Sequence, residues 1–111
     1  MFLPEKVQIE ASLIGRMIRF GDRAHEIISK ISAEHFYSER HRVIFEAVAK
    51  IAASASPNLI AVSSELERSG KIAFIGGAAY LMEIADAAFS MVGTEAEISA
   101  VLDAYKRRQT I

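Results

Sequence analysis

The sequence predicts an all-α fold, a compact bundle of about six helices. Apolar residues recur at steps of three and four along most of the 111-residue chain, which is the spacing of one helix face. Short polar or glycine-containing breaks separate these stretches. The segment at 71–75 (KIAFI) is the one place where a strand could be argued, and without a partner run we expect an extended connector there.

The composition indicates one folded domain without covalent or metal support. Hydrophobic residues make up 51% and charged residues 24% of the chain, proportions typical of a globular protein. The lack of cysteine excludes disulfides, thiol nucleophiles and zinc–thiolate sites. The sequence has neither an uninterrupted apolar run of about 18 residues nor a basic start followed by an apolar core. We therefore expect a cytoplasmic protein without a membrane span.

The first part of the chain predicts two helices and a short turn. Pro4 fits the first turn of the opening helix. Gly15 lies inside that helix at a cost of about 1 kcal/mol relative to alanine, and we interpret it as a close helix–helix contact. Asp22 is predicted to cap a short second helix, and Ser32 a further turn. The predicted buried residues are Leu13, Ile14, Met17, Ile18, Ile27, Ile28 and Ile31.

The remaining helices follow from clear start and stop signals. Ser38 is predicted to begin the most regular helix, and a shorter one over 60–68 is predicted to stop at Gly70. The Gly76-Gly77 pair opens another helix, either as a tight turn or as an anion-holding helix start, and the tight turn is favoured. Residues 94–97 read as a capping box. We divide the chain into a helical head at 1–93 and a C-terminal helix at 94–111.

The last helix carries the candidate interface. An apolar stripe and a basic end give the candidate residues Ile98, Val101, Leu102, Tyr105, Arg107 and Arg108. A terminal helix buries such a stripe either on its own core or against another chain, and the periodicity leaves both alternatives open. Cations at a helix C-terminus also stabilise the helix dipole, so the basic end has a structural interpretation of its own.

Catalytic and metal sites have no support in the sequence. A glycine-rich loop ending in Gly-Lys-Ser or Gly-Lys-Thr is absent, and no serine has a histidine at a motif spacing. The histidines at 25, 35 and 41 lack the spacing of a metal site. His41 is interpreted as a half-buried side chain bonded to a backbone group or carboxylate, with a protein-contact role as the alternative. We therefore expect no enzyme activity, cofactor or metal in this chain.

Direct nucleic-acid contact is not expected either. The net charge is −1, and the two basic groups, near 16–23 and at 106–108, are not interleaved with aromatic residues along the chain. The helices at 60–68 and 77–86 do not form a helix-turn-helix, because their connector is too long and the second helix carries no arginine or lysine.

Short motifs occur in a fixed order along the chain. Residues 34–45 read Glu-x-Phe-Tyr-x-x-x-His-Arg-x-Ile-Phe, residues 66–70 read Leu-Glu-x-x-Gly, and residues 75–81 read Ile-Gly-Gly-x-x-Tyr-Leu. This ordered set resembles the N-terminal domain of bacterial replicative DNA helicases of the DnaB type. The further residues that match the family's motifs are Pro4, Glu10, Leu13, Ile14, Gly15, Ser56 and Pro57.

The resemblance implies a compact helical head followed by a helical hairpin, with 98–111 as its first arm. In the family, such hairpins pair between subunits and build a collar on a hexameric ring, where primase docks and helicase loading is influenced. The resemblance therefore implies a homo-oligomer with an exposed stripe as its dimer seam, and primase or a loader as partner. ATP and magnesium would belong to a separate C-terminal domain.

Two functional hypotheses follow. The first is a non-catalytic assembly and interaction domain of a replicative DNA helicase. The alternative is a stand-alone helical protein that binds and regulates such a helicase, which remains open because the segment at 87–104 matches the family pattern poorly.

Overall fold

The computed structural model describes residues 5–109, and in this range the chain forms six α-helices, two 3-10 turns and no strand. The predicted all-α class is therefore confirmed, whereas Pro4 lies outside the described residues. The helices are α1 (Glu5–Arg19), α2 (His25–Ile28), α3 (Glu39–Ala52), α4 (Leu59–Arg68), α5 (Gly77–Asp86) and α6 (Thr94–Gln109). The 3-10 turns are η1 (Gly21–Arg23) and η2 (Ala33–His35).

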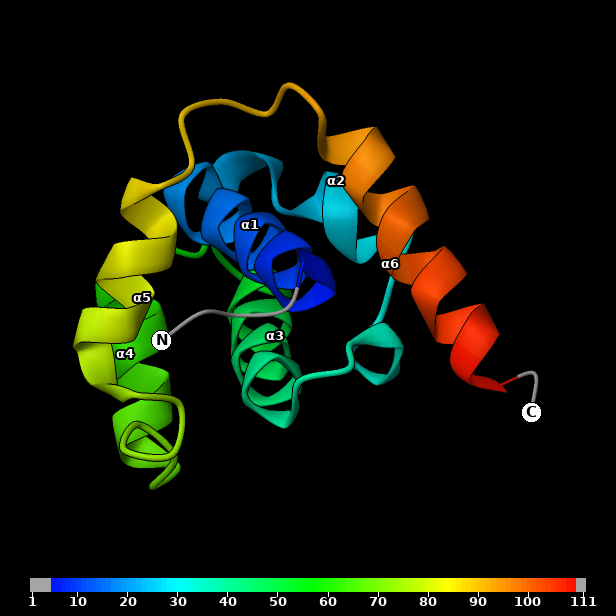
Figure 1. Ribbon diagram of the computed structural model, residues 1–111. Helices are drawn as coiled ribbons and strands as arrows, with labels where there is room; N and C mark the ends of the chain where they lie inside the picture. Colours follow the sequence, from blue (N-terminus) through cyan, green and yellow to red (C-terminus); the bar gives the residue numbers. More distant parts are fainter. Residues whose placement is uncertain (1–4, 110–111) are drawn as a thin grey trace.

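Helix α1 lies at the centre of the bundle. Figure 1 shows α5 on one side of it, α6 on the other and α3 below, and all three contact α1. Leu13, Ile14 and Met17 of α1 are fully buried, as their three- and four-residue spacing predicted. Burial of each such side chain stabilises the fold by about 1.5–3 kcal/mol. The radius of gyration is 13.0 Å, close to the value of about 13 Å expected of a compact domain this long.

Local signals set most helix boundaries correctly. The Ser38 side chain caps α3 by accepting from the backbone N–H of His41, as predicted. Gly70 follows α4 with φ +75°, and Gly76 precedes α5 with φ +102°, so both residues occupy the left-handed region that glycine tolerates best. Asn58, which was not predicted as a cap, caps α4 by accepting from Ala61 N–H at 2.8 Å.

Two predicted caps are wrong. Asp22 lies inside η1, and α2 begins after Ala24. The turn at η1 is set by a long-range contact, because a Cβ at Gly21 would lie 1.7 Å from the Pro57 carbonyl oxygen. Helix α6 begins at Thr94 itself, whose hydroxyl donates to the Met91 carbonyl at 2.6 Å instead of capping the helix.

The helices in the described part of the chain are too short or too polar to cross a bilayer.

Candidate functional site

The candidate interface residues on α6 divide between the core and the surface. Ile98 and Val101 are only 3% and 4% exposed and belong to the hydrophobic core. Leu102 and Tyr105 are half-buried, and Arg107 is exposed. The expectation of an exposed stripe is therefore wrong for Ile98 and Val101, because α6 lies along α1 and uses them to complete the core of its own chain. Residues 110 and 111, the end of the predicted hairpin arm, lie outside the described residues.

Arg16 of α1 fixes the connection between α5 and α6. Its guanidinium donates to the carbonyl oxygens of Ser90 and Val92, at 2.9 and 2.5 Å. It also forms an ion pair with Glu97 of α6 at 3.2 Å and donates to the Thr94 hydroxyl at 3.1 Å. The Arg16 side chain is largely buried, at 12% exposure, so its contacts with Glu97 and Thr94 are partly shielded from water. Arg16, which belongs to the basic group near 16–23, thus attaches α6 to α1.

The basic end of α6 contacts the segment around η2. Arg108 donates to the His35 carbonyl at 3.0 Å. Its guanidinium carbon lies 5.3 Å from the centre of the Tyr37 ring and 5.8 Å from that of the Tyr105 ring. The Tyr105 ring meets the His35 ring edge-to-face at 4.8 Å. The structure thus brings the candidate residues Tyr105 and Arg108 together with two residues that were not proposed as interface residues.

A buried polar network connects α1, α3 and α5. His41 of α3 is fully buried, with Nδ1 3.0 Å from a Glu10 carboxylate oxygen and Nε2 2.6 Å from the Tyr80 hydroxyl. A carboxylate only accepts, so Nδ1 donates to Glu10, while Nε2 shares a hydrogen bond with the Tyr80 hydroxyl. The same Glu10 carboxylate accepts from the backbone N–H groups of Tyr37 and Ser38, at 2.5 and 3.2 Å.

The environment of Tyr80 keeps its hydroxyl available as a donor. Burial raises the pKa of the phenol above its ordinary value, and the Arg40 guanidinium opposes this rise. That guanidinium carbon lies 3.6 Å from the centre of the Tyr80 ring and covers it. The sequence interpretation of His41 was correct in naming a carboxylate partner and incorrect in expecting a half-buried side chain.

The network stabilises the fold and offers no reactive group to a substrate. Glu10 and His41 are buried, and each is bonded to neighbouring elements. Glu10, His41 and Tyr80 are all among the motif residues that carry the family resemblance. They lie too far apart in the chain for their sequence spacing to predict that their side chains meet. We conclude that these motif residues mark how the three helices pack.

The hollows in the described part of the structure are shallow. One of about 220 Å³ lies between α1 and α5, and its lining, which includes Ala11, Ile84 and Ala87, is mostly apolar. Among residues 5–109 no group of three or more histidine, aspartate or glutamate side chains is placed to hold a metal ion. We therefore look for binding sites on the surface of the helices and not in a cavity.

Comparison with known proteins connects this arrangement with one family. The family described as DnaB-like helicase N terminal domain matches residues 3–103. The replicative DNA helicase DnaB of Buchnera aphidicola subsp. Baizongia pistaciae is 30% identical over 110 residues, which are 98% of this chain and 23% of that protein. Its counterpart in Synechocystis sp. is 28% identical over 109 residues, which are 97% of this chain and 12% of that protein. The chain thus spans less than a quarter of the length of these two relatives.

A solved structure supports the same fold. The crystal structure of the N-terminal domain of DnaB helicase from Mycobacterium tuberculosis matches with a TM-score of 0.85 at 22% identity, over 93% of this chain and 74% of that one. The family match covers nearly the whole chain, including most of α6. It therefore extends over most of the segment at 87–104, which matches the family's short motifs poorly. The chain therefore belongs to the DnaB-like helicase N-terminal domain family.

Proposed function

We propose that this chain is a non-catalytic assembly and interaction domain of a replicative DNA helicase. In this role it pairs subunits within the collar of a hexameric ring and docks primase or a helicase loader during DNA replication. ATP hydrolysis, with its magnesium ion, belongs to a separate domain of the parent protein. The observation that supports the proposal most is the family match over residues 3–103, together with relatives named replicative DNA helicase.

The geometry of α6 is compatible with this role. One face of the helix is attached to the core by Ile98, Val101 and the contacts of Arg16. The half-buried Leu102 and Tyr105 and the exposed Arg107 remain at the surface. A helix that is fixed on one face and carries apolar and cationic side chains on another presents a rigid surface, which lowers the entropy cost of binding. We propose this surface as the contact with a second subunit or a partner protein.

The proposal is tested by two measurements, the oligomeric state of the chain in solution and its binding to partner proteins. Light scattering behind a sizing column, at concentrations up to about 200 µM, detects a self-association constant in the micromolar range. We expect a dimer that Leu102→Asp converts to a monomer while the far-UV circular dichroism stays unchanged. The matched control is Ser99→Asp, which places the same charge at an exposed position of the same helix and leaves the dimer intact.

Partner docking is measured separately by biolayer interferometry with the helicase-binding domain of a bacterial primase and with a helicase loader. We expect binding to at least one of them, weakened by the Leu102 variant. A chain that stays monomeric at the highest concentration and binds neither partner would contradict the proposal.

A further inference from the structure

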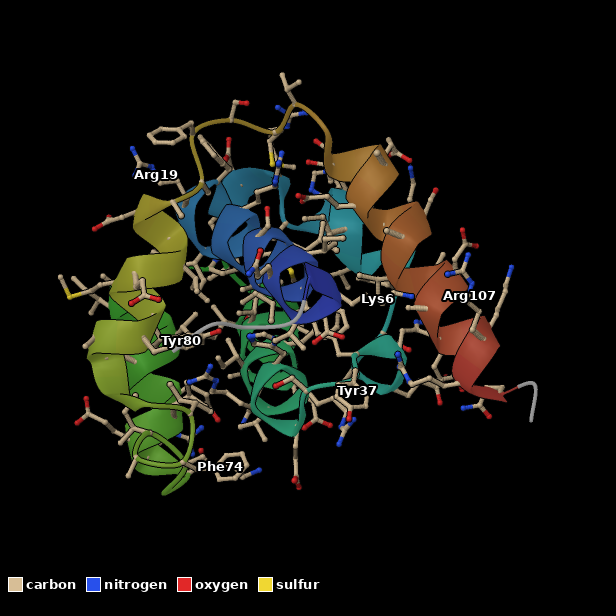
Figure 2. All side chains as sticks on the ribbon, in the orientation of Figure 1. Lys6, Arg19, Tyr37, Phe74, Tyr80 and Arg107 are labelled. Carbon is tan, nitrogen blue, oxygen red and sulfur yellow. The ribbon has the colours of Figure 1, made fainter. Side chains whose placement is uncertain are left out.

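Helix α6 lies at the edge of the bundle. In the described chain it packs mainly against α1, with a smaller contact at η2, whereas α1 itself packs against α3, α5 and α6. Figure 2 shows Arg107 of α6 and Tyr80 of α5 on opposite sides of the molecule. The other long helices are joined directly, through contacts of α1 with α5, of α3 with α4 and of α4 with α5. The packing of these helices therefore does not pass through α6.

Helix α6 buries little apolar surface for its length. Its buried apolar side chains are Ile98, Val101 and Ala104. The shorter α3 buries larger side chains, among them Ile44 and Phe45. Since hydrophobic stabilisation is roughly proportional to the apolar area that is removed from water, apolar contacts hold α6 to the bundle less strongly than they hold α3.

Three basic side chains supply much of the remaining attachment. Arg16 of α1 contacts the first turn of α6 and the connection before it. Lys30 forms a partly exposed ion pair with Glu95 in the same first turn. Arg108, in the last turn, donates to a carbonyl oxygen of η2. Each of these contacts is made by the end of a long side chain, so it can break while the backbone of the other helices stays in place.

The residue before α6 is suited to a hinge. Gly93 is exposed and has φ +89°, a conformation that glycine adopts without strain. In the described chain, a Cβ at this position would meet the Arg16 guanidinium at 3.7 Å and no backbone atom beyond its chain neighbours. Because α6 begins at the next residue, a change of φ and ψ at Gly93 would move the whole helix.

We infer that α6 detaches from α1 as one helical unit, by rotation at Gly93, while the rest of the bundle stays folded, and that Arg16 controls this opening. Proteins open locally in such cooperative units where a segment makes few buried apolar contacts. In the open state Ile98, Val101 and the face of α1 that they cover are exposed to solvent. The contacts of Arg16 exist only in the closed state, so their loss raises the population of the open state.

Opening of α6 also controls the partner surface proposed on this helix. The Tyr105 ring meets the His35 ring, and Arg108 donates to the His35 carbonyl, so this surface is complete only while α6 is closed on η2. A partner that binds the closed state shifts the population toward it. This coupling to a partner rests on the proposed function, whereas the opening of α6 does not.

The test is thiol labelling of the full chain, which contains no cysteine of its own. Val101→Cys places one thiol beneath α6, and Val48→Cys places one within α3, at valines that are 4% and 0% exposed. An aromatic disulfide reagent is too large for the hollow of about 10 Å³ beside Val101, so it reacts there only after opening. We expect the thiol at 101 to react at least about 30-fold faster than the thiol at 48, which becomes accessible only when the whole bundle unfolds. Circular dichroism confirms that both variants fold.

Further substitutions separate detachment of α6 from unfolding of the whole chain. Arg16→Ala should speed labelling at 101 by about tenfold or more, because it removes several hydrogen bonds of a charged group. The control Arg23→Ala, which removes an ion pair between η1 and α2, should leave that rate unchanged. Ile75→Val, at a fully buried position between α4 and α5, should speed labelling at 48 by roughly 2–10-fold. It should leave the rate at 101 unchanged, because Ile75 stays buried in the open state.

Three results would overturn the inference. Equal labelling rates at 101 and 48 would show that α6 leaves α1 only when the whole chain unfolds, and so would equal acceleration of both rates by Ile75→Val. A rate at 101 that does not respond to Arg16→Ala would show that Arg16 does not control the opening. The labelling needs no partner, so its outcome is independent of the docking measurements that test the proposed function.

Discussion

Substitution of Gly15 by alanine sets helix propensity against tertiary packing. Propensity alone predicts that Gly15→Ala stabilises α1 by about 1 kcal/mol. In the folded chain, however, a Cβ at this position would lie 2.1 Å from the Ile84 carbonyl oxygen and 2.8 Å from the Ile84 carbonyl carbon. Both atoms belong to the backbone of α5, so no side-chain rotation can relieve the contact.

The two effects can be compared in magnitude. To restore an ordinary contact, α1 and α5 must separate by about 1 Å, and overpacking of this kind typically costs 1–3 kcal/mol or more. Because the obstacle is backbone, we expect the upper part of that range. After the propensity gain is subtracted, Gly15→Ala should lower the free energy of unfolding by about 1–2 kcal/mol. For a chain of this length that corresponds to a decrease in Tm of roughly 4–10 °C.

Urea unfolding followed by circular dichroism at 222 nm measures this change. Ser99→Ala is the matched control, because Ser99 is exposed on α6 and the substitution should raise stability by a few tenths of a kcal/mol through propensity alone. If Gly15→Ala proves as stable as the unsubstituted chain or more stable, the close approach of α1 and α5 does not limit this position, and the packing argument fails.

Three further predictions concern the polar contacts. Tyr80→Phe removes the hydrogen-bond partner of the buried Nε2 of His41 and should lower the free energy of unfolding by about 1–3 kcal/mol. A change below about 0.5 kcal/mol in urea unfolding would show that this hydrogen bond does not stabilise the fold. Arg16→Ala should increase hydrogen exchange in the connection between α5 and α6 and in the first turn of α6, while α3 keeps its protection; uniform loss of protection would indicate global destabilisation instead. The hydrogen bond from Arg68 lowers the pKa of the Glu65 carboxyl below its ordinary value of 4.5, so its contribution to stability is present above that value and is lost as the pH falls through the lowered pKa. Glu65→Gln should therefore reduce stability at pH 7 but not in acid, and a pH-independent difference in Tm would contradict this origin.

Several features of the fold could be predicted from sequence because they depend on residues close together in the chain. The three- and four-residue spacing of Leu13, Ile14 and Met17 sufficed to identify the buried face of α1, since helix geometry alone places them on one side. Ser38 and Gly70 act on backbone groups within one turn, so their roles as cap and stop were also predictable. Even the cost of Gly15 within its helix correctly indicated a close contact, although not its partner.

The tertiary structure alone decided which distant groups meet. Periodicity left open whether α6 buries its apolar stripe internally, and packing along α1 placed Ile98 and Val101 in the core. The network from Glu10 through His41 to Tyr80 joins residues up to 70 positions apart, a separation at which side-chain spacing carries no information. The sequence by itself therefore determined the helices and their buried faces, because those follow from local geometry. The polar contacts, and the joining of Tyr37 with the basic end of α6, depended on how the helices pack against one another.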